Sequence, residues 1–126
     1  MNKLSFLLWL LLPLSLFGQT KSMKALQFEK AEIIRKDIPY DSKELFLFTF
    51  KNKSNKPLSI LSVQTSCGCT TAKKPEEPIA KHKKGQISVS YDTKRVGEFV
   101  KSITVTSNIG NPVVLTIRGN VLPEKQ

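Results

Sequence analysis

The two cysteines of the chain, Cys67 and Cys69, are its clearest candidates for chemistry, and one glycine, Gly68, separates them. Residues two apart in an extended strand have Cα atoms about 6.6 Å apart, which is near the far limit of disulfide geometry. A bend at Gly68 would shorten this distance, because glycine also adopts positive φ. The ring that such a bond closes is small, and strained, exposed disulfides are the readily reduced ones. The pair therefore fits either a local structural disulfide or a redox pair, and we predict that Ser66, Gly68 and Thr70 form a turn that supports it.

Thiol–disulfide exchange is the one enzymatic chemistry that the sequence offers. A redox pair needs an accessible sulfur and a stabilised thiolate, and Lys73 and Lys74 could supply positive charge if they fold back toward Cys67. The sequence has no glycine-rich phosphate loop and no serine set between glycines as a nucleophile elbow. Its single histidine, His82, stands in the lysine-rich stretch 81–84, which is typical of a solvated loop. We therefore predict no catalytic residue, and no enzyme activity unless the cysteine pair exchanges disulfides.

The same pair could bind a metal ion, as a weaker alternative. Two thiolates suit a soft ion of low coordination number such as Cu(I). A structural zinc ion takes four ligands, and besides the pair the chain offers one histidine. We therefore predict no metal and no cofactor, and copper binding by Cys67 and Cys69 stays open.

The first residues have the order of a secretory signal peptide. A short basic start at residues 1–3 precedes an apolar run over residues 4–17, and small and polar residues follow it. The apolar run is shorter than the roughly 20 residues that cross a bilayer, so no stable membrane span is expected once it is removed. We predict a signal peptide at residues 1–18, a short linker at 19–25, and a secreted, periplasmic or extracellular protein. Disulfides persist in those compartments.

The rest of the chain reads as short strands separated by turns, without a long helical period. In the segment 44–51 three phenylalanines share one face and Leu45 and Leu47 the other, which predicts burial of both faces. A change of parity near Ile60 predicts a bulge, and the polar residues 71–84 predict a long surface loop. The expected strands are 25–34, 44–51, 58–63, 86–91, 99–107 and 113–118.

This spacing of strands predicts the fold class. About six or seven short strands within about 100 residues are typical of a β-sandwich. We predict an all-β, immunoglobulin-like β-sandwich of about seven strands over residues 26–122, with a polar tail at 123–126. The antibody type of core is not expected, because the one tryptophan lies in the predicted signal peptide and the two cysteines are neighbours in sequence.

The chain is strongly basic, with 20 lysines and arginines against 10 acidic residues and a formal net charge of +10. Most of the lysines fall in turns, which is typical of a solvated surface. Outside the cytoplasm an anionic partner would be lipid headgroups, envelope polysaccharide or an acidic protein. Nucleic acid is not expected as a partner, because of the export signal and because the loops lack the aromatic residues on which bases stack.

Several motifs together point to a known family. The stretch "FTFKNKSNKPLSI" carries Phe50, Asn52, Pro57, Leu58 and Ile60. The further motifs are "SCGCT" at residues 66–70, "EPI" at 77–79, and "GQISVSYDT", "GEFVKSITVTSN" and "VVLTIRGNV" in the later strands. With these motifs the chain resembles the bacterial family catalogued as domain of unknown function 1573, over roughly residues 26–122. In two places it departs from the family pattern: residues 80–84 replace a Pro-Gly turn, and Glu29 follows Phe28 where a Phe-Gly pair is usual.

The resemblance implies an extracytoplasmic immunoglobulin-like domain, similar to the major sperm protein and PapD-like sandwiches, and implies little about activity. We therefore expect an exported, non-catalytic module that binds or scaffolds components of the cell envelope. Its partner would be an unknown envelope protein or an anionic surface, and edge-strand pairing would be the mode of binding. The alternative is a small thiol–disulfide redox protein, or a copper-binding protein, that uses the Cys67-Gly68-Cys69 pair.

Overall fold

A computed structural model of the chain describes residues 24–126, so the predicted signal peptide and most of the predicted linker lie outside the described part. Between residues 24 and 126 the chain forms strands and no helix, and thus no helix that could span a membrane. The strands are β1 (Leu26–Phe28), β2 (Glu32–Ile38), β3 (Leu45–Asn52), β4 (Ile60–Thr65), β5 (Thr70–Lys73), β6 (Lys84–Tyr91), β7 (Gly97–Ser107) and β8 (Val113–Val121).

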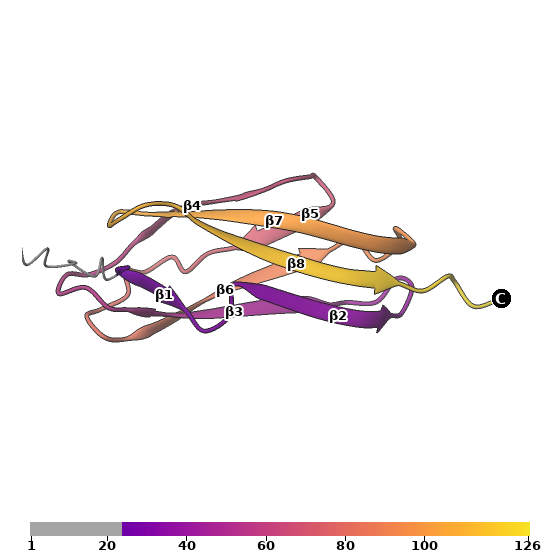
Figure 1. The fold of residues 1–126 in the computed structure, drawn as a ribbon, viewed down its shortest axis with the longest axis horizontal. Coiled ribbons are helices and arrows are strands. Elements are labelled where there is room, and N and C mark those ends of the chain that lie inside the picture. Colours follow the sequence, from indigo (N-terminus) through magenta and orange to yellow (C-terminus); the bar gives the residue numbers. More distant parts are fainter. Residues whose placement is uncertain (1–23) are drawn as a thin grey trace, which may run out of the picture.

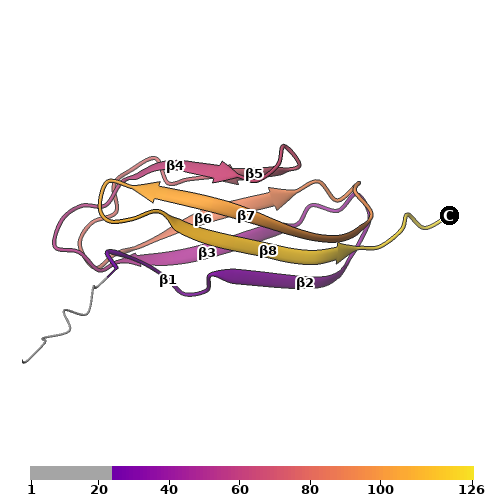
Figure 2. The ribbon, with the colours of Figure 1, turned by 45° about the horizontal axis from the view of Figure 1, so that its top comes forward.

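The strands form two layers of four, in the orders β1-β3-β6-β5 and β2-β8-β7-β4. Figures 1 and 2 show the layers facing each other in an elongated sandwich, with β4 and β5 along one long edge. The pairing is antiparallel throughout except between β2 and β8, which run parallel. The predicted all-β, immunoglobulin-like sandwich is confirmed.

The core lies between the two layers and is filled by alternate residues of the inner strands, as the period of two requires. Its largest fully buried side chains come from β2, β3, β6, β7 and β8, and from Leu58, which precedes β4. They are Ile38, Phe46, Phe48, Phe50, Leu58, Ile87, Val89, Ile103, Val105, Leu115, Ile117 and Val121. The three phenylalanines of the segment 44–51 thus share one buried face, as predicted.

The second face of that segment is not buried, and here the prediction was wrong. Leu45 and Leu47 are 53% and 46% exposed. They lie on the outer face of β3 opposite Ser90 and Ser88 of β6. A sandwich has only two layers, so the outer face of each sheet meets solvent unless a further element covers it.

Two further elements differ from the prediction because of how strands pair. The segment 25–34, expected as one strand, divides between the sheets, with β1 beside β3 and β2 beside β8. The segment 71–84, expected as a loop, contributes most of β5, in which Thr70 pairs with Tyr91 at the edge of β6. The predicted bulge near Ile60 is confirmed by a shift of register between Ile60 and Ser62.

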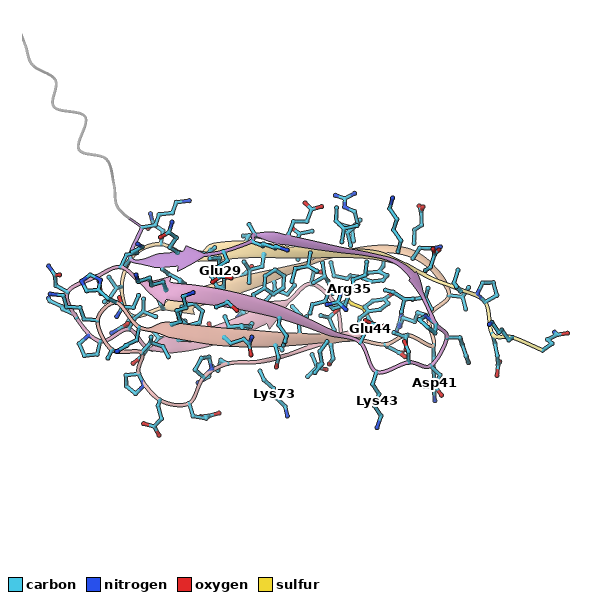
Figure 3. All side chains as sticks on the ribbon, turned by 90° about the horizontal axis from the view of Figure 1, so that it is seen from below. Glu29, Arg35, Asp41, Lys43, Glu44 and Lys73 are labelled. Carbon is cyan, nitrogen blue, oxygen red and sulfur yellow. A yellow bond between two sulfur atoms is a disulfide. The ribbon has the colours of Figure 1, made fainter. Side chains whose placement is uncertain are left out.

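The long edge of the sandwich at β2 and β3 is closed by a charged side chain. The Arg35 guanidinium donates hydrogen bonds to Glu44 Oε2 at 3.0 Å and to the backbone oxygen of Leu45 at 3.2 Å. It also lies over the ring of Phe46, 5.3 Å from the ring centre, where a cation–π attraction is expected. Figure 3 shows Arg35 and Glu44 pointing toward each other at this edge. At the opposite edge, residues 66–69 connect β4 to β5.

Candidate functional site

The two cysteines lie where the chain leaves one sheet and enters the other. β4 is an edge strand of the sheet β2-β8-β7-β4, and β5 is an edge strand of the sheet β1-β3-β6-β5. Residues 66–69 connect them, so Cys67 follows the end of one sheet and Cys69 precedes the start of the other. This placement depends on tertiary structure, since the sequence alone does not say which strands share a sheet.

The structure joins Cys67 and Cys69 in a disulfide, with a Cα–Cα distance of 5.3 Å. That distance lies inside the usual range of about 4.4 to 6.8 Å. A tight turn makes it short, in which the Thr70 N–H donates to the Cys67 carbonyl oxygen at 3.3 Å. The proposed bend at Gly68 is therefore present, but its backbone does not need glycine. Positive φ among the glycines occurs only at Gly97 and Gly110 of residues 24–126.

The two sulfurs differ in exposure. Cys69 is 7% exposed and belongs to the hydrophobic core, whereas Cys67 is half-buried and packs at the rim of that core. Gly68 between them is exposed, and a Cβ added there would meet no atom within 4 Å. The space beside Gly68 is therefore open, and Cys67 is the more exposed of the two cysteines.

Hydrogen-bond donors approach the sulfur of Cys67. The N–H of Cys69 donates to Cys67 Sγ at 3.3 Å. The buried Thr70 hydroxyl oxygen lies 3.6 Å from Cys67 Sγ and 3.7 Å from Cys69 Sγ. Donors at these positions favour the thiolate form of a reduced cysteine, because they stabilise its negative charge.

Backbone hydrogen bonds hold each side of the turn to its own sheet. Ser66 N donates to Ser102 O of β7 at 3.0 Å, and Ser102 N donates to Ser66 Oγ at 3.1 Å. On the other side the N–H of Asp92, which follows β6, donates to the Cys69 carbonyl oxygen at 2.9 Å. Both cysteines therefore have anchors that do not depend on the sulfur–sulfur bond.

The structure gathers the residues predicted to support the pair, and it adds one that the sequence did not reveal. Ser66 and Thr70 both take part through the bonds just described. The added residue is Thr65, whose hydroxyl donates to the backbone oxygens of Cys67 and Thr70, at 3.1 Å in each case. Its proximity in sequence was the only available signal, since its role depends on the turn folding back.

Lys73, one of the two lysines considered for thiolate stabilisation, lies away from the pair. Lys73 is exposed on the outer face of β5, and in Figure 3 its side chain points away from the sandwich. His82 is exposed in the turn before β6, with a positive φ of 60°. Within residues 24–126 no group of three or more His, Cys, Asp or Glu side chains could hold a metal ion. The polar contacts at Cys67 therefore come from the turn itself.

The edge strand that leads into this turn is unusual in its composition. β4 has six residues and no charged side chain, although the chain as a whole is highly charged. The other edge strands are each protected: β2 carries four charged residues among seven, β1 has only three residues, and β5 has four and ends at Lys73. Charge and shortness are the usual means by which proteins prevent unwanted pairing at a sheet edge.

The motifs noted in the sequence match a family model described as "Protein of unknown function (DUF1573)", over residues 26–121. The chain belongs to this family. The match spans every strand from β1 to β8, so the DUF1573 domain and the observed sandwich coincide. No curated protein matches the chain.

Several solved structures share the fold of this DUF1573 protein at low sequence identity. A PapD-like domain of human CEP192 has a TM-score of 0.61 and 9% identity, covering 81% of this chain and 87% of its own. A protein of unknown function from Porphyromonas gingivalis W83 has a TM-score of 0.65 and 12% identity, covering 76% of this chain and 46% of its own. The YadV chaperone has a TM-score of 0.59 and 16% identity, covering 77% and 52%.

The chain thus spans about half the length of the last two structures. At these identities the similarity establishes a PapD-like immunoglobulin fold and nothing more specific. It supports describing the protein as a β-sandwich module of uncharacterised function.

Proposed function

We propose that this protein is an exported, non-catalytic binding or scaffolding module of the cell envelope, and that it binds its partner by strand addition to β4. The observation that carries the proposal is the uncharged, six-residue edge of β4 beside well-protected edges elsewhere. Among the structural neighbours, YadV is a chaperone, and that name is consistent with protein binding on such a fold.

The geometry of β4 favours strand addition. The Ser66 N–H donates to the carbonyl oxygen of Ser102 on β7, so by the alternation of an antiparallel ladder the backbone groups of Gln64 and Ser62 also face β7. The backbone N–H and C=O groups of Val63 and Thr65 then point away from β7, toward the free side. A partner strand can pair with these groups, which gives affinity through main-chain hydrogen bonds.

An exposed side chain marks the start of this edge. Leu61 is 58% exposed at the bulge and would be covered by a strand that pairs alongside β4. Ile34 on β2, the opposite edge of the same sheet, is 57% exposed and provides a matched control. Substituting either residue with a charged one alters the surface to a similar degree, but only Leu61 borders the proposed interface.

The test is a capture experiment from envelope extract with four variants, L61K, L61E, I34K and I34E. We expect the wild type, I34K and I34E to retain the same partner, and L61K and L61E to lose it. Amide hydrogen exchange of the complex should show new protection at Val63 and Thr65. Loss of capture in the Ile34 variants as well, or protection confined to β2, would count against β4 as the interface.

We further propose that the protein acts outside the cytoplasm. The support is the signal-peptide pattern of residues 1–18 together with a disulfide, which is a bond of oxidising compartments. The measurement is the intact mass of the protein recovered from fractionated cells, with a mature start at Gln19 expected. Recovery of the full-length chain from the cytoplasm would contradict this proposal.

A second candidate function is thiol–disulfide exchange at Cys67 and Cys69. The specific observation in its favour is the pair of donors aimed at Cys67 Sγ in an open turn. Trapping of free thiols across glutathione redox buffers, read by mass spectrometry, measures the state of the pair. We expect a transition within the buffered range, and a bond that stays closed throughout that range would remove this candidate.

A further inference from the structure

We propose that Cys67 is the sulfur that exchanges with a partner, and that the partner is an extended, cysteine-containing peptide segment paired along β4. The proposal rests on the β4 edge described above and names the chemistry of its ligand. Two neighbouring features support it. One is an edge strand open to pairing, and the other is a disulfide whose first cysteine lies two residues beyond the end of that strand.

Continuity between β4 and the disulfide carries the argument for the partner's shape. An added strand lies about 4.8 Å from β4 and advances about 3.3 Å per residue. Consider the residue of the added strand that pairs with Thr65. The residue two positions further along the added strand, in the direction of the turn, would lie beside Cys67. Gly68 leaves open space on the exposed side of the turn, so no side chain of its own blocks the approach. A disulfide reacts with a thiolate, so the residue delivered there would be a cysteine.

Exposure decides which sulfur is attacked. The partner thiolate attacks the Sγ of Cys67, a half-buried residue, rather than the Sγ of Cys69, a residue of the core. A bond forms between the partner sulfur and Cys67, the Cys67–Cys69 bond breaks, and Cys69 leaves as a thiolate with the bonding electron pair. The Thr70 hydroxyl, 3.7 Å from Cys69 Sγ, can donate a hydrogen bond to this thiolate.

The second step returns the partner or oxidises it. The Cys69 thiolate can attack Cys67 and restore the original disulfide, which releases the partner unchanged. Alternatively, a second thiolate of the partner attacks the partner's own sulfur in the mixed disulfide. A disulfide then forms within the partner, which loses two electrons, and Cys67 leaves as a thiolate stabilised by the Cys69 N–H and the Thr70 hydroxyl. The reduced pair takes up its protons from water.

The backbone can remain in place during exchange. Ser66 stays bonded to Ser102 of β7, and the carbonyl oxygen of Cys69 stays bonded to Asp92 N. Opening of the sulfur–sulfur bond thus leaves both sides of the turn attached to their own sheets. We therefore expect the sandwich, including β4, to keep its structure in the mixed disulfide.

The first test maps the mixed disulfide on the wild-type protein. The probes are glutathione and two capped eight-residue peptides of threonine and valine. Each peptide carries one cysteine, which lies near the N-terminus in one peptide and near the C-terminus in the other. After reaction and quenching with N-ethylmaleimide, mass spectrometry should place the probe on Cys67 and the maleimide on Cys69. We expect the faster peptide to react at least tenfold faster than glutathione, and L61K to slow the peptide without slowing glutathione. A probe on Cys69, or equal rates for peptide and glutathione, overturns the proposal.

The second test concerns Thr70 as a positioning residue. In a Cys69→Ser background, Cys67 should attack a thionitrobenzoate-activated peptide at least tenfold faster than Cys69 does in a Cys67→Ser background. The substitution T70V should move the midpoint of the rate–pH profile of Cys67 upward, and T70S should restore it. An unchanged profile in T70V, or equal rates for the two cysteines, contradicts the assignment.

A control peptide, called the twin, in which serine replaces the cysteine, separates the proposal of strand addition at β4 from the proposal of disulfide exchange at Cys67. If the twin binds wild-type protein and binds L61K more weakly, the β4 interface stands whatever the cysteines do. If the twin binds but no probe reaches Cys67, the exchange proposal alone fails. If the twin does not bind, strand addition at β4 fails, and delivery of a cysteine along β4 fails with it.

Discussion

Substitution of Asn52 by alanine should destabilise the domain more than any comparable change at its surface. Asn52 is fully buried at the end of β3. Its side-chain nitrogen donates to the backbone oxygens of Lys56 at 2.7 Å and Ile79 at 2.9 Å. Its Oδ1 accepts from the N–H of Ser54 at 2.9 Å and from the Ser54 hydroxyl at 2.7 Å. This one side chain therefore ties the turn after β3 to the segment before β6.

The cost follows from these contacts, and the one to the Ser54 hydroxyl counts least because its single proton is shared between Asn52 Oδ1 and Lys56 O. A buried hydrogen bond contributes about 0.5–1.5 kcal/mol, and an acceptor left without a partner adds more. Neither carbonyl acceptor is orphaned, because Lys56 O still accepts from Ser54 Oγ and Ile79 O still accepts from Leu58 N. We therefore expect a loss of about 3 kcal/mol in the free energy of unfolding, near the lower part of the summed range. The corresponding fall in melting temperature is about 12 °C or more.

Urea unfolding of wild type, N52A and N55A measures this difference. Asn55 is the matched control, since it lies in the same turn, is exposed and has no positive φ. We expect N55A to stay within about 0.5 kcal/mol of wild type. A loss below about 1 kcal/mol in N52A, or an equal loss in N55A, would refute the hydrogen-bond account of this site.

Three further predictions concern backbone, disulfide and pH. G119A should lower the free energy of unfolding by about 2 kcal/mol or more, because the added Cβ would lie 2.7 Å from a backbone oxygen of β2. The added Cβ of G68A would contact no atom within 4 Å, so this variant should be neutral in the same urea assay. Replacing Cys67 and Cys69 together by serine should cost roughly 1.5 kcal/mol of unfolding free energy, since the closed loop is very short, and a loss above about 4 would favour a mainly structural role. Burial raises the pKa of Tyr91 above its usual 10.0, the Arg95 guanidinium opposes this rise, and the Asp92 carboxylate adds a smaller upward contribution. The stability that Tyr91 contributes is thus complete below pH 10 and lost as pH rises through the raised pKa. Y91F should therefore flatten the decline of urea stability above pH 10.

Much of the fold could be predicted because the inner strands alternate cleanly. The period of two puts Ile87 and Val89 on one face of β6, and Leu115 and Ile117 on one face of β8, and all four are fully buried. The predictions failed where burial depends on what lies beyond a strand. Leu45 and Leu47 are as apolar as core residues, and they are exposed because no third layer formed by residues 24–126 covers this part of the sandwich.

The candidate site could be predicted in composition but not in geometry. The CGC spacing alone indicated a short ring, and the short Cα–Cα distance agrees with it. The approach of the Thr70 hydroxyl to both sulfurs and the bonds from Thr65 depend on a turn whose shape is set by two different sheets. Similarly, Lys73 was considered because it is near in sequence, but the alternation of β5 puts it on the outer face.

The sequence by itself determined the fold class, the family and the position of the cysteine pair, because hydrophobic alternation, turn residues and short motifs are local properties of the chain. Only the tertiary structure decided which strands became edges and which face of each met solvent, because those outcomes depend on pairing between distant segments. It therefore also decided that the uncharged strand β4 is an edge and that the cysteine turn joins the two sheets. Both proposals for this protein depend on that arrangement.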